Sequence, residues 1–339
     1  MKINLKISLF ILLVIFLFSS IFLSSYATGI TTVAEAAEAG AFKDIKIRFF
    51  TGGAEGDPFG TIVYNGALEA QKYLGVQVEY VFSGWDNEKM ISQLRDAVAA
   101  RPDGIAMMGH PGNDAIMPLA EQAFKDGILM TYQNVDVPEV RAKFGGGYVG
   151  ADLVSQGRAL GEEAIKLFDL KAGDEAVVYG NWEMPGRYIR EEATAIAFED
   201  AGLKVRKISV PTPAISDTEL LLPVFTADLL ANPDTKAIVF ANSTSLGASQ
   251  VYLDAAGVKP GDVKIIGFDN SSAIMDAFSK GYVHLSSDQQ PYLQGFIPIL
   301  SLVLTKAYGL SAISLDTGKG FITAENYKDV GALVEIGLR

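Results

Sequence analysis

Cysteine is absent from the 339-residue chain, and histidine occurs only twice, at His110 and His284. Without cysteine there is no disulfide, thiolate metal site or cysteine nucleophile, and two histidines are too few for a multi-histidine metal centre. Basic residues are also scarce, since 28 Lys and Arg oppose 40 Asp and Glu, a net charge of −12. Nucleic-acid binding relies on basic patches that displace counterions. We therefore expect no cofactor, no metal and no nucleic-acid partner.

Residues 1–39 form a segment with its own pattern. Two lysines precede the apolar run Ile7–Leu23, and A-x-A-like triplets end at Ala27 and Ala39. A basic start, an apolar run and small residues at a cleavage site are typical of a secretory signal peptide. We expect this signal to be cleaved and the protein to be periplasmic or extracytoplasmic. Because the run has the minimum length of a membrane span, an uncleaved anchor is the alternative.

Short apolar runs alternate with helical patterns through the rest of the chain. Met90, Leu94 and Val98, for example, share one face of a helix that is expected to end before Pro102. Most of the runs are apolar on both faces, as strands of a covered parallel sheet are. This alternation predicts an α/β fold of doubly wound parallel sheets. The expected strands are Ile45–Phe50, Val76–Phe82, Gly104–Met108, Ile128–Tyr132, Glu175–Tyr179, Val205–Val210, Ala237–Ala241 and Val263–Phe268.

The spacing of these strands favours two similar lobes over one long sheet. Four strands precede residue 140 and four follow residue 170. We expect the chain to pass between the lobes first within Phe144–Asp152, which contains three consecutive glycines. Such a run has the backbone freedom of a hinge, although an ordinary flexible loop has the same composition.

Polar and aromatic side chains follow most of the expected strands. Ligands of open parallel sheets bind beyond the carboxyl ends of the strands, so these positions are candidate ligand contacts. Planar amides and carboxylates bind neighbouring hydroxyls, and aromatic faces cover the C–H surface of a sugar ring. The set predicts a site for a neutral sugar or polyol. The candidates are Asp57, Phe59, Gln133, Asn134, Trp182, Arg187, Arg190, Asn242, Asp269 and Gln289.

Some of these residues have a structural alternative. Asp57 precedes Pro58 and fits a helix N-cap as well as a ligand contact. Of the two tryptophans, we favour Trp182 over Trp85 in the site. At least one of the two candidate arginines is expected to face the ligand, and structural roles are favoured for both histidines.

Several segments carry a family resemblance in their order along the chain. They include Asp57-Pro58-Phe59 after the first strand, Ile266-Gly267-Phe268-Asp269, and the run Asp288–Gly295. With the signal segment, they resemble type I periplasmic binding proteins of the ribose/galactose class, the solute receptors of sugar ABC transporters. The resemblance covers about residues 43–339. It implies two α/β lobes, joined by three segments, that close over a ligand in the cleft between them.

The resemblance also implies how the chain is divided. The N-terminal lobe holds residues 43–150 and takes back about 291–322, and the C-terminal lobe holds 151–290 and about 323–339. Gln133 and Asn134 stand where ribose receptors have an Asp-Arg pair, which argues against ribose as the ligand. The implied partners are a sugar or polyol and a membrane ABC permease, with a chemoreceptor or sensor kinase as a further possibility, and the implied state is a monomer.

Three functional classes remain open. A transport receptor, which we favour, binds its solute without turnover. A signalling receptor has the same fold and reports an autoinducer-like ligand or a quaternary amine. Nearby acids offer an aromatic cage for such an amine together with four rings, those of Phe59, Trp85, Tyr132 and Trp182. A glycoside-cleaving enzyme needs a positioned carboxylate pair, and no motif supports one.

Overall fold

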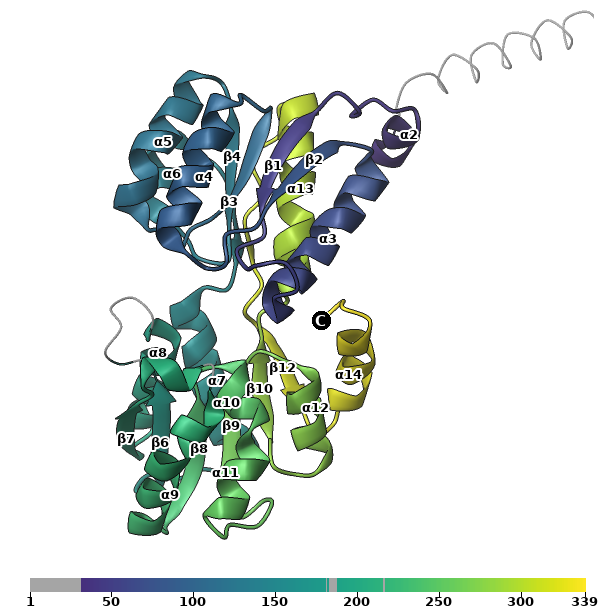
Figure 1. Cartoon of the computed structure of the whole chain (residues 1–339). Helices are drawn as coiled ribbons and strands as arrows, with labels where there is room; N and C mark the ends of the chain where they lie inside the picture. Colours follow the sequence, from purple (N-terminus) through teal and green to yellow (C-terminus); the bar gives the residue numbers. More distant parts are fainter. Residues whose placement is uncertain (1–31, 181, 183–187, 216) are drawn as a thin grey trace, which may run out of the picture.

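The computed structural model describes residues 32–180, 182, 188–215 and 217–339, which form two lobes (Figure 1). The sheet of the first lobe has the strand order β11-β5-β4-β3-β1-β2, and all its pairings are parallel. Its strands are β1 (Lys46–Phe50), β2 (Gln77–Val81), β3 (Gly104–Met108), β4 (Leu129–Gln133), β5 (Tyr148–Gly150) and β11 (Leu315–Asp316).

The sheet of the second lobe has the order β12-β10-β9-β8-β6-β7. Its pairings are parallel except that of β10 with β12, which is antiparallel. Its strands are β6 (Glu175–Gly180), β7 (Lys204–Ser209), β8 (Thr235–Phe240), β9 (Lys264–Phe268), β10 (Leu285–Asp288) and β12 (Gly320–Thr323). The predicted α/β class with two doubly wound sheets is confirmed.

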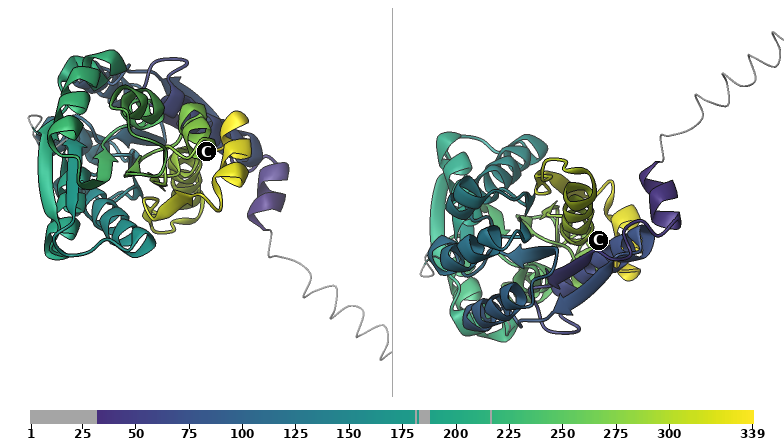
Figure 2. Two further views of the ribbon diagram at one scale, coloured as in Figure 1. Left: turned by 90° about the horizontal axis from the view of Figure 1, so that it is seen from below. Right: turned by 90° about the horizontal axis from the view of Figure 1, so that it is seen from above.

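Helices lie on both sides of each sheet, as the two views of Figure 2 show. They enclose one apolar core in the first lobe and one core on each face of the second sheet. The helices of the first lobe are α2 (Val33–Glu38), α3 (Pro58–Leu74), α4 (Asn87–Ala99), α5 (Asn113–Lys125), α6 (Pro138–Phe144) and α13 (Pro291–Tyr308). Those of the second lobe are α7 (Leu153–Phe168), α8 (Ile189–Asp200), α9 (Leu222–Ala231), α10 (Ser243–Gly247), α11 (Ser249–Ala255), α12 (Ser272–Ser279) and α14 (Tyr327–Glu335), with 3-10 turns at Thr212–Ile215 and Thr218–Leu220.

The chain passes between the lobes three times. The first crossing segment, Ala151–Asp152, leads from β5 to α7. The second, Gln289–Gln290, leads from β10 to α13, which packs against α3 of the first lobe. The third, Thr317–Lys319, joins β11 to β12. Because β12 pairs with β10, the chain re-enters the second sheet by Gly320, slightly before the division near residue 322 that the resemblance implies.

The structure differs from the sequence expectations at two places. The first crossing segment, Ala151–Asp152, lies within the expected range Phe144–Asp152, but the three glycines precede β5 and are not part of the crossing. They allow close approach instead, since a Cβ at Gly147 would lie 1.9 Å from the carbonyl oxygen of Ile313. The helical pattern from Leu246 to Leu253 is divided between α10 and α11, which meet at Ala248.

Within residues 32–180, 182, 188–215 and 217–339, no helix combines the length and apolar character that crossing a bilayer requires.

Candidate functional site

Asp57 lies at the carboxyl end of β1 and caps the helix that follows. Its Oδ1 accepts a hydrogen bond of 2.7 Å from the backbone N–H of Gly60, and Pro58 occupies the first turn of α3. Its Oδ2 accepts a bond of 3.0 Å from the indole Nε1 of Trp85. The capping role is therefore present, and the same carboxylate fixes an aromatic ring beside it.

Trp85 is the centre of an aromatic group at this edge of the first sheet. Its ring centroid lies 5.9 Å from that of Phe59 and 5.1 Å from that of His110. The backbone of Trp85 has a φ of 60°, in the left-handed region. Gly52 permits this packing, because a Cβ there would lie 2.4 Å from Trp85 Cζ3. The local backbone is thus shaped to present these rings.

Gln133 and Asn242 each combine one bonded and one unbonded polar atom. Gln133 is fully buried at the end of β4, where its Nε2 donates to the carbonyl of Phe50 at 2.9 Å. Asn242 caps α10 through its Oδ1, which accepts from the N–H of Ser245 at 2.8 Å. The Oε1 of Gln133 and the Nδ2 of Asn242 are buried and have no hydrogen-bond partner among the described residues. A buried polar group without a partner is costly, so each of these atoms needs an ordered water or a ligand group to bind.

Asp269 and Arg190 form a largely buried ion pair in the second lobe. Their side chains are 19% and 16% exposed, and Arg190 Nη2 lies 3.4 Å from Asp269 Oδ2. The same Nη2 donates to the carbonyl of Ala241 at 2.7 Å, and the guanidinium stacks 4.4 Å above the Phe268 ring. The positive charge of Arg190 therefore balances the acid at the end of β9, which favours a neutral ligand there.

Gln289 links this pair to the first lobe. Its Nε2 donates to Asp269 Oδ1 at 2.6 Å, and its Oε1 lies 3.4 Å from the Nδ2 of Asn134. The carboxyl ends of β4 and β9 thus meet in one polar network. Asn134, Asp269 and Gln290 have φ values of 65°, 74° and 51°. Left-handed backbone at non-glycine residues is uncommon and gathers at functional sites.

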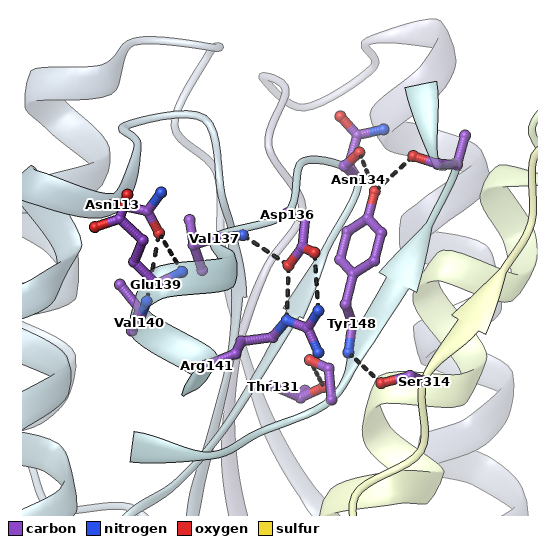
Figure 3. Close-up of polar contacts among 12 residues, drawn as sticks. Asn113, Thr131, Asn134, Asp136, Val137, Glu139, Val140, Arg141, Tyr148 and Ser314 are labelled. Atoms are coloured by element: carbon purple, nitrogen blue, oxygen red, sulfur yellow. Dashed lines mark hydrogen bonds and ion pairs between the residues drawn. The ribbon is translucent and has the colours of Figure 1, made fainter. Parts of the chain in front are cut away.

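A polar brace holds Asn134 in place (Figure 3). The hydroxyl of Tyr148 lies 2.9 Å from the carbonyl oxygens of both Asn134 and Ala151. Burial raises the pKa of Tyr148, which keeps the hydroxyl protonated and able to donate. Next to it, Arg141 binds Asp136 in bidentate fashion at 2.7 and 2.8 Å. The turn after β4 is therefore tied to the first crossing segment.

Trp182 has partners within its own lobe. Its Nε1 donates to the carbonyl of Val178 at 3.3 Å, and its ring lies 5.9 Å from that of Tyr188 and 5.6 Å from Lys207 Nζ. The structure therefore does not bring Trp182 into the Arg190–Asp269–Gln289 network, and its role as a ligand contact stays a prediction. Arg187, the other candidate arginine, lies outside the described residues.

The structure adds two residues to the candidate site that the sequence analysis did not favour. Trp85, the less favoured tryptophan, stands beside Asp57 and Phe59. Its position after a strand, before the α4 cap Asp86, was the available signal. Gln294, on the first turn of α13, is fully buried and bonds to Asn134 and Gln289. Within the described ranges, no group of three or more histidines and acids is arranged to hold a metal ion.

The structure has two doubly wound lobes joined by three crossing segments, with amides and acids at the strand ends. This arrangement defines a class of two-lobed solute-binding proteins. Comparison of the sequence with known protein families identifies the family. Residues 47–305 match the model of the periplasmic binding protein domain, and the chain belongs to this family.

Two curated relatives are 24% and 30% identical to the chain over their aligned parts. The xylose/arabinose-binding protein XylF of Sulfolobus acidocaldarius is 24% identical over 71% of this chain and 61% of its own length. The chain thus spans about three fifths of that relative. The D-ribose/D-allose-binding protein of Pseudomonas aeruginosa is 30% identical over 66% of this chain and 71% of its own length.

A solved structure supports the same fold. A carbohydrate transporter from Acidothermus cellulolyticus, in complex with myo-inositol, superposes with a TM-score of 0.70 at 24% sequence identity. The superposition covers 87% of this chain and all of the other. The two chains therefore share the type I periplasmic binding protein fold.

Proposed function

We propose that the chain is the solute-binding component of a sugar ABC transporter, which binds a neutral monosaccharide or polyol between its lobes and closes over it. It delivers the solute to a membrane permease and does not transform it. Both curated relatives described above are sugar-binding proteins by name, which supports this class of ligand.

The observation that carries the proposal is that each lobe holds a buried amide atom without a partner among the described residues, at the end of β4 in the first lobe and after β8 in the second. Gln133 Oε1 is a buried acceptor in the first lobe, and Asn242 Nδ2 is a buried donor in the second. A hydroxyl group both donates and accepts hydrogen bonds. The hydroxyls of a polyol can therefore donate to Gln133 Oε1 and accept from Asn242 Nδ2. Closure of the lobes on such a ligand satisfies both atoms at once.

The surrounding residues favour a neutral ring. The acid of Asp269 is balanced by Arg190, and that of Asp57 is bound by the N–H of Gly60 and the indole of Trp85. We assign Phe59 and Trp85 as the apolar wall that covers the C–H face of the sugar. Asp269, Arg190, Asn134 and Gln289 supply bonds to the hydroxyls.

Thermal unfolding with a ligand panel tests this function. The panel holds neutral pentoses, hexoses and inositols, with quaternary amines and sugar acids as comparison compounds. A ligand at about 1,000 times its Kd adds roughly 4 kcal/mol to stability, so the midpoint rises by several degrees. A rise with a neutral sugar or polyol supports the proposal. A rise with amines alone contradicts it and favours the aromatic cage.

Export of the protein and removal of its N-terminal segment need a separate measurement. We propose that the N-terminal segment directs export and is removed, and that the protein acts as a monomer. Mass spectrometry of the exported protein tests removal, which predicts a first residue near position 28 or 40. Recovery of the intact N-terminus from a membrane fraction supports an anchor instead.

A further inference from the structure

Gln294 is a fully buried glutamine whose amide nitrogen and amide oxygen both make hydrogen bonds. Its Nε2 donates to the carbonyl of Gln289 at 3.0 Å and to the Oγ1 of Thr317 at 3.1 Å. Its Oε1 accepts from Asn134 Nδ2 at 3.0 Å. One side chain thus uses both amide hydrogens and its acceptor within a buried network, where deletion of a partner leaves orphaned groups.

These bonds reach all three crossing segments. Gln289 belongs to the second and Thr317, which is 2% exposed, to the third. The first is reached through Asn134, whose carbonyl shares the Tyr148 hydroxyl with that of Ala151 (Figure 3). Gln294 itself stands on the first turn of α13, which packs along α3 of the first lobe. The relative orientation of the lobes therefore depends on groups that meet at this amide.

The Gln294 amide is connected to the proposed ligand contact Asp269 by two successive hydrogen bonds, through Gln289. Gln289, which Gln294 holds by its backbone carbonyl, donates from its side chain to Asp269 Oδ1 at 2.6 Å. A ligand hydroxyl that binds Asp269 competes for, or reorders, this bond. Any change in Gln289 then acts on Gln294 and, through it, on Asn134 and Thr317.

We infer that Gln294 is a positioning residue that couples occupancy of the Asp269–Gln289 pair to the angle between the lobes. It does not touch the ligand. It fixes the Gln289 and Asn134 side chains against the three crossing segments, so that binding and closure occur together. This inference deepens the proposed function and rests on it for the ligand, but its effect on the ligand-free protein stands independently.

The test compares Gln294→Met with Gln71→Met. Methionine keeps the length and volume of glutamine and removes the amide. Gln71 offers a matched control, because its amide makes a part-buried bond of 2.8 Å with Tyr80 inside the first lobe. The chain has no cysteine, so Lys125→Cys and Lys236→Cys, at an exposed position in each lobe, carry unique spin labels. Electron resonance then gives the inter-lobe distance distribution with and without the sugar that the panel identifies.

We expect Gln294→Met to broaden or shift the ligand-free distribution and to weaken sugar binding at least tenfold, while Gln71→Met changes neither. An unchanged distribution and an affinity within twofold of wild type overturn the inference, as does the same loss in Gln71→Met. If Gln294→Met fails to fold, Thr317→Val, which removes only the Oγ1 acceptor, must alter the distribution, and an unaltered one overturns the inference.

The two proposals fail in different ways. If no panel sugar binds wild type but Gln294→Met alters the ligand-free distribution, the sugar function fails and the role of Gln294 stands. If a sugar binds tightly and the distribution of Gln294→Met matches wild type, the function stands and the role of Gln294 fails.

Discussion

The proposed ligand contacts are single residues at strand ends. Asp269 is recognisable in the sequence, because an acid directly after the buried run Ile265–Phe268 has little structural reason to be there. The pairing of Asp57 with Trp85 was not predictable, since it requires the left-handed backbone at Trp85 and the missing Cβ of Gly52. Sequence patterns locate strand ends well but do not give the side-chain directions that such turns impose.

Asp269→Asn is expected to weaken sugar binding by ten- to a hundredfold, about 1–3 kcal/mol, and also to lower stability, because the largely buried Arg190 loses its counter-charge. The amide keeps the shape but loses the charge that faces Arg190 and one acceptor that Gln289 and the ligand use. Titration calorimetry measures the change. Asp276→Asn, at an exposed acid, is the control and should bind as wild type does. Unchanged affinity in Asp269→Asn removes it from the site.

The two tryptophans make a direct comparison. Trp85→Phe should abolish the change in intrinsic fluorescence on ligand binding, because this indole stands with Phe59 and Asp57 at the first-lobe edge. Trp182→Phe should keep most of it, since that ring packs within its own lobe. The opposite pattern supports the sequence-based expectation that Trp182, and not Trp85, lies in the site.

His284 makes stability depend on pH. Burial lowers the pKa of His284 to about 4, and its Nδ1 accepts from the N–H of Ile265. Between about pH 6.5 and 4, His284 is protonated in the unfolded chain but neutral in the folded chain. The free energy of unfolding therefore falls as the pH drops from 6.5 towards 4. Urea unfolding at pH 7.5 and pH 5 should show a loss, on the order of 2 kcal/mol at most, that His284→Gln lacks. An identical pH dependence in both proteins contradicts this assignment.

At the scale of elements, the long apolar runs were predictable and the short strands were not. The eight expected strands all form, and their observed ends lie within two residues of the expected ones. The four strands that were not expected, β5, β10, β11 and β12, have two to four residues each, too few for any periodic pattern. Their pairing depends on the crossing segments and on neighbours distant in sequence, which no local signal encodes.

The contact between α3 and α13 depends on two glycines that face each other. A Cβ at Gly295 would lie 1.9 Å from the carbonyl oxygen of Val63, and one at Gly66 would lie 2.1 Å from that of Tyr292. Gly295→Ala should therefore force the helices apart and reduce the free energy of unfolding by about 1–3 kcal/mol.

Denaturant unfolding of Gly295→Ala tests this contact, with Gly331→Ala as the control. Gly331 is also helical, but the nearest atom to an added Cβ is 3.5 Å away, an ordinary contact. Alanine there should stabilise the helix by up to about 1 kcal/mol. Equal effects of the two changes contradict the proposed close approach.

At the scale of the whole molecule, the motif order carried more information than composition. The spacing of the strands predicted the first passage between the lobes, within Phe144–Asp152. The other two passages followed from the family resemblance, because crossing segments of two or three residues carry no hydropathy pattern. Composition alone excluded thiol and multi-histidine chemistry. The family match over residues 47–305 then supports a receptor whose two lobes act together on one solute.

Small-angle X-ray scattering of the purified protein, with and without the sugar that the panel identifies, tests this account most directly. Stoichiometric binding should reduce the radius of gyration as the lobes close, and chromatography of the recovered ligand should return the sugar unchanged. A sugar that binds one to one without any change in the scattering contradicts closure, and a chemically altered sugar contradicts a receptor altogether.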